Sequence, residues 1–157
     1  MVLLGGSHDS TYSTVRGMFD ANGGQAVGDI NLDAHTDVKN KPKISSGTPF
    51  GKLLREGFLR GEGFTKIGLH FNLNTKQDID FLHQQQARVV PLVQVQKDGM
   101  AHYLSRALAR ATATGPVFVS FDIDGCAEAG PQRRWFYAPA SGRNSFYGRP
   151  ARAGAAV

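Results

Sequence analysis

The feature that most constrains the fold is an alternation of short apolar runs and helical patterns along the first 124 residues. Apolar runs that could form strands lie at 2–4, 27–32, 66–69, 87–92 and 116–121, and helical patterns lie at 11–21, 48–57, 76–86 and 100–111. Strands that alternate with helices form parallel sheets covered on both faces. The sequence therefore predicts an α/β fold of three layers, α/β/α, whose central sheet is mostly parallel.

Residues 125–157 have a different composition. They contain eight alanines, five glycines, three prolines and five arginines, with no lysine, leucine or isoleucine. No period of 2 or 3.6 residues continues there, so we expect neither a core strand nor an amphipathic helix. We predict one domain over residues 1–124 and an irregular tail over 125–157. A frameshift near residue 130 would account for this change.

The composition is that of a soluble globular protein, with 41% hydrophobic and 20% charged residues among 157. No run approaches the ~18–20 apolar residues of a membrane span, so no membrane association is expected. The single cysteine, Cys126, excludes an internal disulfide. These features favour the cytoplasm.

The net charge of +5 raises the possibility of nucleic-acid binding. Residues 1–124 contain 13 basic and 12 acidic residues, whereas residues 125–157 contain five arginines and one glutamate. The excess charge is therefore confined to the tail, which lacks the stacking or helical organisation of a nucleic-acid-binding face. We expect no nucleic-acid partner, and binding through the tail arginines is the weaker alternative.

Acidic and imidazole side chains are concentrated in three short segments: Gly5–Asp9, Asn31–Asp37 and Ser120–Asp124. Each segment directly follows a predicted strand. In parallel sheets, ligands bind outside the carboxyl ends of the strands. We therefore expect the three segments to converge on one crevice.

Two histidines and four aspartates in these segments are candidate metal ligands: His8, Asp33, His35, Asp37, Asp122 and Asp124. Four neighbouring carboxylates do not all stay ionised without a cation between them. Nitrogen and oxygen ligands without thiolate favour Mn²⁺ or a similar hard ion. Residues two apart on an extended chain project to the same side, so each of the segments Asp33–Asp37 and Asp122–Asp124 can present all its ligands in one direction. Taken singly, His8 could be a loop histidine and the Asp122–Asp124 pair a helix cap.

The same segments resemble the signature motifs of the arginase–ureohydrolase superfamily, which includes arginases, agmatinases, guanidinobutyrases and formimidoylglutamases. The matching motifs are Gly-Gly-Ser-His-Asp, Asp-Ala-His-Thr-Asp and Ser-Phe-Asp-Ile-Asp, and Ser46–Phe50 resembles a further active-site segment. The resemblance covers residues 1–124 in order. It implies an arginase-like fold that is incomplete at both ends, since family members are longer than this chain.

The resemblance also implies a site with two Mn²⁺ ions per chain. His8 and Asp37 would bind one ion, His35 and Asp124 the other, and Asp33 and Asp122 would bridge them. The metal pair would lower the pKa of a bridging water, giving a hydroxide that attacks an amidine or guanidine carbon. His35 and Asp124 would be catalytic, with Asp124 steadying the proton or the tetrahedral intermediate.

The substrate implied is a small amidine or guanidine. Many arginases and agmatinases have a histidine before the glycine that matches Gly47, whereas Ser46 stands here, as in formimidoylglutamase-like sequences. Lys39 suits an anionic substrate. With Lys39, Ser46 and Gly47 as substrate contacts, the implied reaction converts N-formimidoyl-L-glutamate to L-glutamate and formamide in histidine degradation. The alternatives are an agmatinase- or arginase-type guanidine hydrolase and an inactive truncated remnant, and a homo-oligomer is possible.

Overall fold

The centre of the molecule is a four-stranded, fully parallel sheet with the strand order β3-β2-β1-β4. The computed structural model describes residues 2–126, 143–144 and 149–150. The strands are β1 (Val27–Leu32), β2 (Leu59–Leu69), β3 (Arg88–Pro91) and β4 (Val117–Phe121). Every connection between consecutive strands contains at least one helix, which confirms the predicted parallel α/β architecture.

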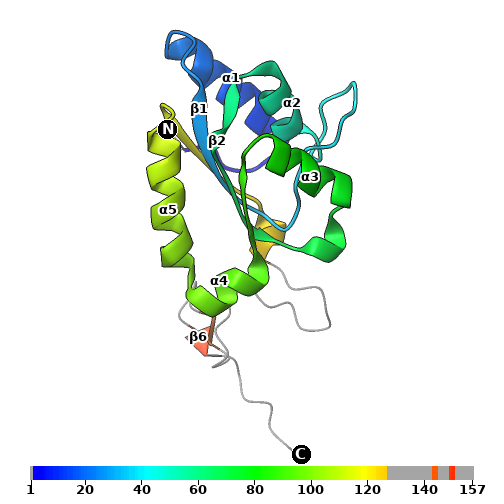
Figure 1. The fold of residues 1–157 in the computed structure, drawn as a ribbon, viewed down its shortest axis with the longest axis vertical. Coiled ribbons are helices and arrows are strands. Elements are labelled where there is room, and N and C mark those ends of the chain that lie inside the picture. Colours follow the sequence, from blue (N-terminus) through cyan, green and yellow to red (C-terminus); the bar gives the residue numbers. More distant parts are fainter. Residues whose placement is uncertain (1, 127–142, 145–148, 151–157) are drawn as a thin grey trace, which may run out of the picture.

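Helices cover both faces of this sheet (Figure 1). On one face lie α1 (Ser10–Ala21), α2 (Pro49–Glu56) and α3 (Lys76–Gln84), whose apolar side chains share one buried cluster with the sheet. On the other face, α4 (Leu92–Asp98) and α5 (Met100–Thr112) form a second cluster. The remaining elements are short: η1 (Phe71–Leu73), η2 (Ile123–Cys126), β5 (Arg143–Asn144) and β6 (Arg149–Pro150). The three predicted layers are therefore present.

The central strand β1 is packed closely on both sides, because all six of its residues are buried. Gly28 lies against α5, where an added Cβ would be only 2.3 Å from the carbonyl oxygen of Ala111. A glycine at this position therefore allows the helix to approach the strand at backbone distance. This contact anchors the strand whose carboxyl end carries the candidate ligands.

Three details differ from the sequence prediction. Strand β2 begins at Leu59, seven residues before the predicted start. Its first half contains two glycines and alternates buried and exposed residues, so it lacks the apolar run by which a strand was predicted. Helix α4 begins at Leu92, the last residue of the predicted strand 87–92, and continues through residues 93–98, for which no element was predicted. Residues 2–4 form no strand, because this short segment pairs with no other strand of the described residues, and the positive φ angles of Gly5 and Gly6, 84° and 87°, end its extended course.

The described residues include no helix that combines the length and the apolar character needed to cross a bilayer. Most of the tail after residue 124 lies outside the described residues. The division of the chain at that point therefore stays a prediction.

An unusual feature of β1 is a carboxyl group inside the sheet. Asp29 is fully buried, and neither of its side-chain oxygens has a hydrogen-bond partner among the described residues. Burial raises the pKa of Asp29 well above its ordinary value, although the charges of Lys66 and His8 act in the opposite direction. The folded protein therefore favours the protonated form of this group.

We predict that Asp29→Asn stabilises the protein, and that the gain grows as the pH rises. The carboxyl ionises near pH 4 in the unfolded chain but keeps its proton to a higher pH when folded, so its contribution to stability is lost as the pH rises above about 4. The neutral amide removes this loss, and we expect a gain of about 1–3 kcal/mol at pH 7. Urea unfolding of both proteins at pH 4.5 and pH 7 measures it.

The matched control is Asp20→Asn, because Asp20 is an exposed aspartate on α1. Its effect on stability should be small at both pH values. If the stability difference between wild type and Asp29→Asn does not change with pH, then Asp29 is not held in its protonated form by the fold.

Candidate metal centre

Two of the candidate ligands lie side by side because the strands that carry them are neighbours. Asp33 directly follows β1 and Asp122 directly follows β4, and these strands pair in parallel with Leu32 opposite Phe121. The backbone N–H of Asp122 donates to the carbonyl of Leu32 at 2.9 Å, which extends the pairing to the ligand itself. The carboxyl ends of the two strands thus bring both carboxylates to one edge, as the sequence predicted.

The imidazole of His8 lies within this group of carboxylates. Its Nδ1 is 2.8 Å from Asp37 Oδ2, 3.2 Å from Asp122 Oδ2 and 3.3 Å from Asp33 Oδ2. One ligand atom from each of these four residues lies within 4.8 Å of the other three. Three segments that are far apart in the sequence therefore meet in a group with the size and the donor atoms of a metal site.

Of the other two candidate ligands, only His35 has a described side chain, and it lies at the margin of the cluster. His35 Nδ1 lies 3.8 Å from Asp33 Oδ1, and the His35 side chain is 40% exposed. Asp124 belongs to η2, beside the cluster in sequence, but its side chain lies outside the described residues. Four of the six candidate ligands therefore lie together, and His35 lies at their margin. Metal binding by the six residues stays a prediction.

Lys66 is a component of the site that was not predicted from the sequence. It belongs to β2, its side chain is fully buried, and its ammonium group lies 3.2 Å from Asp33 Oδ2. The ammonium also donates to the carbonyl of His35 at 2.8 Å and lies 4.2 Å from the centre of the Phe50 ring. The sequence did contain a sign of this role, because Lys66 stands in an otherwise apolar strand. A buried lysine requires an acidic partner inside the fold.

These charges shift the pKa values of the cluster in opposite directions. Burial disfavours the charged form of Asp33, but Lys66, His8 and the backbone N–H of His35 outweigh burial and lower the pKa of the carboxyl. Burial also disfavours the imidazolium of His8. Hydrogen bonds to Asp122, Asp33 and Asp37 nevertheless raise the pKa of His8 to about 11. The cluster therefore attracts positive charge strongly.

The ring of His8 is oriented by residues behind it. The side-chain amide of Asn31 donates to Ser120 Oγ at 2.9 Å and lies 3.3 Å from His8 Nε2, while the Phe50 ring packs edge-on against the imidazole at 5.2 Å. With Nε2 turned toward Asn31, Nδ1 faces the carboxylates. The contacts with Asn31 and Phe50 therefore set the direction in which the imidazole ring points.

Backbone contacts hold the turn that carries the ligands after β1. Asn74 bridges this turn, accepting from the N–H of Thr36 at 2.8 Å and donating to the carbonyl of Ala34 at 2.9 Å. Asp37 adopts a positive φ of 51°, which is uncommon for a residue other than glycine. On the opposite side, Gly125 lies so close that an added Cβ would be 2.9 Å from the Cα of Asp33. The turn is therefore confined from two directions.

The predicted substrate contacts lie in the loop that follows Asp37. The backbone N–H of Lys39 donates to the carbonyl of Gly47 at 3.0 Å, and the side chain of Lys39 runs alongside Gly47. Lys39 and Ser46 are exposed. The loop thus brings Lys39 next to Gly47 and leaves its ammonium group available to solvent, although contact with a substrate stays a prediction.

Comparison with known proteins yields consistent similarities. Residues 1–151 match the model of the Arginase family. The chain is 31% identical over 142 residues to the mitochondrial agmatinase of Gallus gallus, and 34% identical over 125 residues to the formimidoylglutamase of Klebsiella pneumoniae. These alignments cover 88% and 78% of this chain, respectively, but only 39% of each relative.

A solved structure agrees in both fold and sequence. The crystal structure of Trypanosoma cruzi formiminoglutamase with Mn²⁺ superposes with a TM-score of 0.69 at 31% identity, covering 76% of this chain and 40% of that one. The chain therefore spans about two fifths of the length of the relatives that it matches. The family match over residues 1–151, the parallel α/β sheet and the cluster at its carboxyl edge together establish that this chain belongs to the arginase family.

Proposed function

We propose that this chain carries the metal centre of a binuclear manganese hydrolase that cleaves a C–N bond in a linear amidine or guanidine. The main supporting observation is the convergence of one imidazole and three carboxylates within 4.8 Å, at the carboxyl edge of the sheet. The family match agrees with this proposal, as does the related formiminoglutamase of Trypanosoma cruzi, whose crystal structure was solved with Mn²⁺.

The donor atoms in this cluster fit a hard divalent cation. Carboxylate oxygens and one imidazole nitrogen, without a thiolate, favour Mn²⁺ over structural zinc. Despite the opposing effect of burial, the three carboxylates also raise the pKa of His8 to about 11, so the cluster gathers positive charge where the cation would lie. Two ions per chain would require His35 and Asp124 in addition, and we propose both as ligands of the second ion.

When bound, the metal pair would supply Lewis acidity that makes a water nucleophilic near neutral pH. The residues of the chain would hold and orient this centre. Lys66 and the N–H of His35 hold the two oxygens of Asp33 in place, and the Phe50 ring packs against the imidazole of His8. Asp124 is the proposed acceptor of the proton released as the nucleophile attacks.

Among possible substrates we favour N-formimidoyl-L-glutamate, with glutamate and formamide as products. The exposed ammonium group of Lys39 beside Gly47 suits a substrate that carries carboxylates and would repel the cation agmatine. The Klebsiella pneumoniae relative is named formimidoylglutamase. An agmatinase-type hydrolase is the second candidate, since the Gallus gallus relative is a mitochondrial agmatinase. A cytoplasmic location and a homo-oligomeric assembly stay predictions.

We predict that the purified chain binds about two Mn²⁺ ions, the number proposed for two-metal sites, and that Asp33→Ala abolishes specific binding. Loss of Asp33 removes the proposed bridging carboxylate and leaves the buried ammonium group of Lys66 without its acidic partner. Metal analysis after Mn²⁺ loading and desalting measures the stoichiometry, and circular dichroism checks that the variant is folded.

Asp20→Ala is the matched control, because it removes an exposed aspartate on α1, outside the cluster. Its Mn²⁺ content should equal that of the wild type. If the wild-type chain retains no Mn²⁺ beyond that of the folded Asp33→Ala variant, the ligands do not form a metal site and the proposal is wrong.

We also predict that Lys39→Gln raises KM for N-formimidoyl-L-glutamate about tenfold or more, which corresponds to loss of a charged hydrogen bond. The turnover of a cationic guanidine such as agmatine should not fall. Steady-state kinetics of the Mn²⁺-loaded protein with both substrates measures the difference. Lys43→Gln, an exposed lysine of the same loop, is the control.

Equal loss with both substrates would mean that Lys39 supports the loop and does not select the substrate. If the chain binds Mn²⁺ but hydrolyses neither compound, the centre assembles without the remainder of an active site. That outcome would favour the third interpretation, a remnant without activity.

A further inference from the structure

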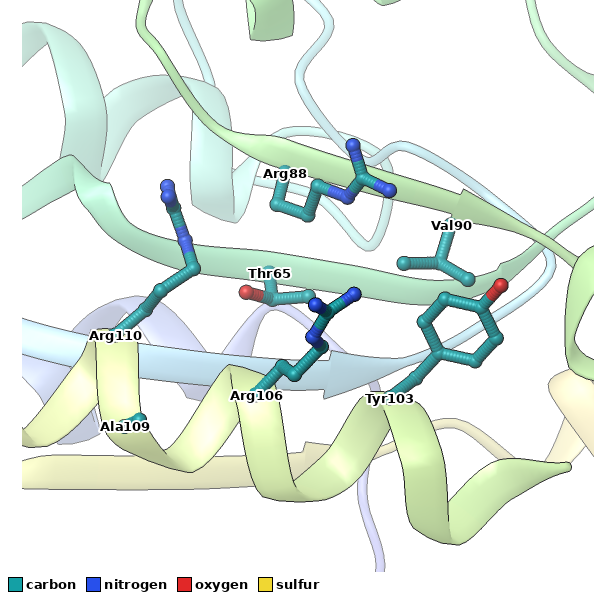
Figure 2. A pocket seen from close by; sticks show the side chains of 7 residues that line it. All are labelled: Thr65, Arg88, Val90, Tyr103, Arg106, Ala109 and Arg110. Carbon is teal, nitrogen blue, oxygen red and sulfur yellow. The ribbon is translucent and has the colours of Figure 1, made fainter. Parts of the chain in front are cut away.

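A second cavity lies between the sheet and α5, away from the metal centre. It has a volume of about 450 Å³ and is lined by Thr65 of β2, by Arg88 and Val90 of β3, and by four residues of α5, namely Tyr103, Arg106, Ala109 and Arg110. Figure 2 shows the three arginine side chains extending from β3 and α5 around Thr65. Its volume is in the range of small-molecule sites.

This cavity lies on the opposite face of the sheet from the Asp33–Lys66 pair, because Thr65 and Lys66 are successive residues of β2 and their side chains alternate between the faces. Arg88 is the first residue of β3, and Arg110 donates to the carbonyl of Gln86 at 3.0 Å, just before that strand begins. The candidate ligands instead follow the carboxyl ends of β1 and β4. The cavity is therefore separate from the proposed active site.

The lining is strongly cationic. Three of its seven residues are arginines and none is acidic. Asp98 accepts a hydrogen bond from the Tyr103 hydroxyl of the lining at 2.5 Å. Within the described part of the chain, the guanidinium group of Arg88 makes no hydrogen bond or ion pair, and that of Arg106 lies 3.4 Å from His102 Nε2. Mutual repulsion of these guanidinium groups would be relieved by an anion.

Buried polar atoms without partners provide a second observation. Thr65 is only 2% exposed, and its hydroxyl has no hydrogen-bond partner among the described residues. The Nε of Arg110 is likewise buried and unpaired within that part of the chain, although the other end of this guanidinium is held by the carbonyls of Gly61 and Gln86. Buried groups of this kind usually have a partner, and both line the same cavity.

From these observations we propose that the cavity binds a phosphate monoester. Arginine guanidinium groups match the oxygens of a phosphate in a bidentate manner, and the Thr65 hydroxyl offers a further donor. Val90, Ala109 and the ring of Tyr103 provide an apolar wall for the organic group of the ester. The cavity is also larger than an inorganic phosphate needs. This site does not depend on the proposed hydrolase activity.

Calorimetric titration of the full chain with phenyl phosphate, without added metal, tests the proposal. We expect saturable binding with one site per chain, and weakening as the salt concentration rises. Phenol, which lacks the anion, should not bind measurably. Benzoate, which has a single charge and two oxygens, should bind at least tenfold more weakly. Benzoate binding as tight as phenyl phosphate would overturn the phosphate assignment.

Substitutions locate the site. Arg88→Gln and Arg106→Gln should each weaken phenyl phosphate binding roughly tenfold or more, and Thr65→Val should weaken it to a smaller extent. Arg88→Lys keeps the charge but loses the planar fork, so it should recover only part of the affinity. Arg16→Gln, an exposed arginine on α1, is the matched control and should leave the affinity unchanged.

Arg88 and Arg106 are exposed, so their substitution should leave the thermal unfolding midpoint near that of the wild type. Absence of saturable binding by the folded wild-type chain would overturn the proposal. So would equal affinity of the wild type and the Arg88→Gln/Arg106→Gln double variant, since binding would then occur elsewhere on the protein.

Discussion

The compensation of buried negative charge at the carboxyl ends of β1 and β4 is the constraint on which the rest of this structure depends. Asp33 is almost completely buried, and a buried carboxylate is stable only when it is paired and hydrogen-bonded. Lys66 supplies an internal positive charge to one oxygen, and the N–H of His35 donates to the other. Asp37 and Asp122 add two more carboxylates, so the internal lysine cannot neutralise the group. The remaining charge deficit is what a divalent cation would fill.

This arrangement follows from the topology of the sheet. Parallel pairing places the ends of β1 and β4 at one edge, and a turn immediately after β1 brings the carboxylates of Asp33 and Asp37 together at that edge. His8 reaches the cluster from just before the start of α1, which packs on α2 at the same face. The packing of Phe50 from α2 against both His8 and Lys66 connects the helical layer to the charged group. The carboxylate cluster is therefore packed directly against the apolar core through Phe50.

Much of this could be predicted from the sequence, because strand ends and metal ligands leave local patterns. The alternation of apolar runs predicted the layers and the parallel sheet, and β1 was predicted with its observed bounds. Helix α4 was missed because the seven residues after Pro91 show no clear period, and the segment at Val2–Leu4 was too short to form a ladder without a neighbouring strand. Local patterns carry no information about partners that form only in the folded chain.

The contacts of Lys66 and Asn31 are of this kind, because they form only in the folded chain. Each lies inside a strand, where the period-2 pattern assigns a side chain to one face but does not say what it meets there. Lys66 meets Asp33 across two strands, and Asn31 meets Ser120 and His8 from different parts of the chain. A polar residue in an apolar strand predicts that a partner exists, and only the fold identifies it.

Successive residues of β2 show how one strand can serve two separate sites. Lys66 projects toward α2 and the carboxylates, whereas its neighbour Thr65 projects to the opposite face and lines the cavity beneath α5. Side chains of a strand alternate between faces, so the two sites share backbone but no side chains. Both carry excess charge, which is negative at the carboxylate cluster and positive in the cavity beneath α5. An anion beneath α5 would thus face arginines and would not compete with a cation bound at the carboxylate cluster.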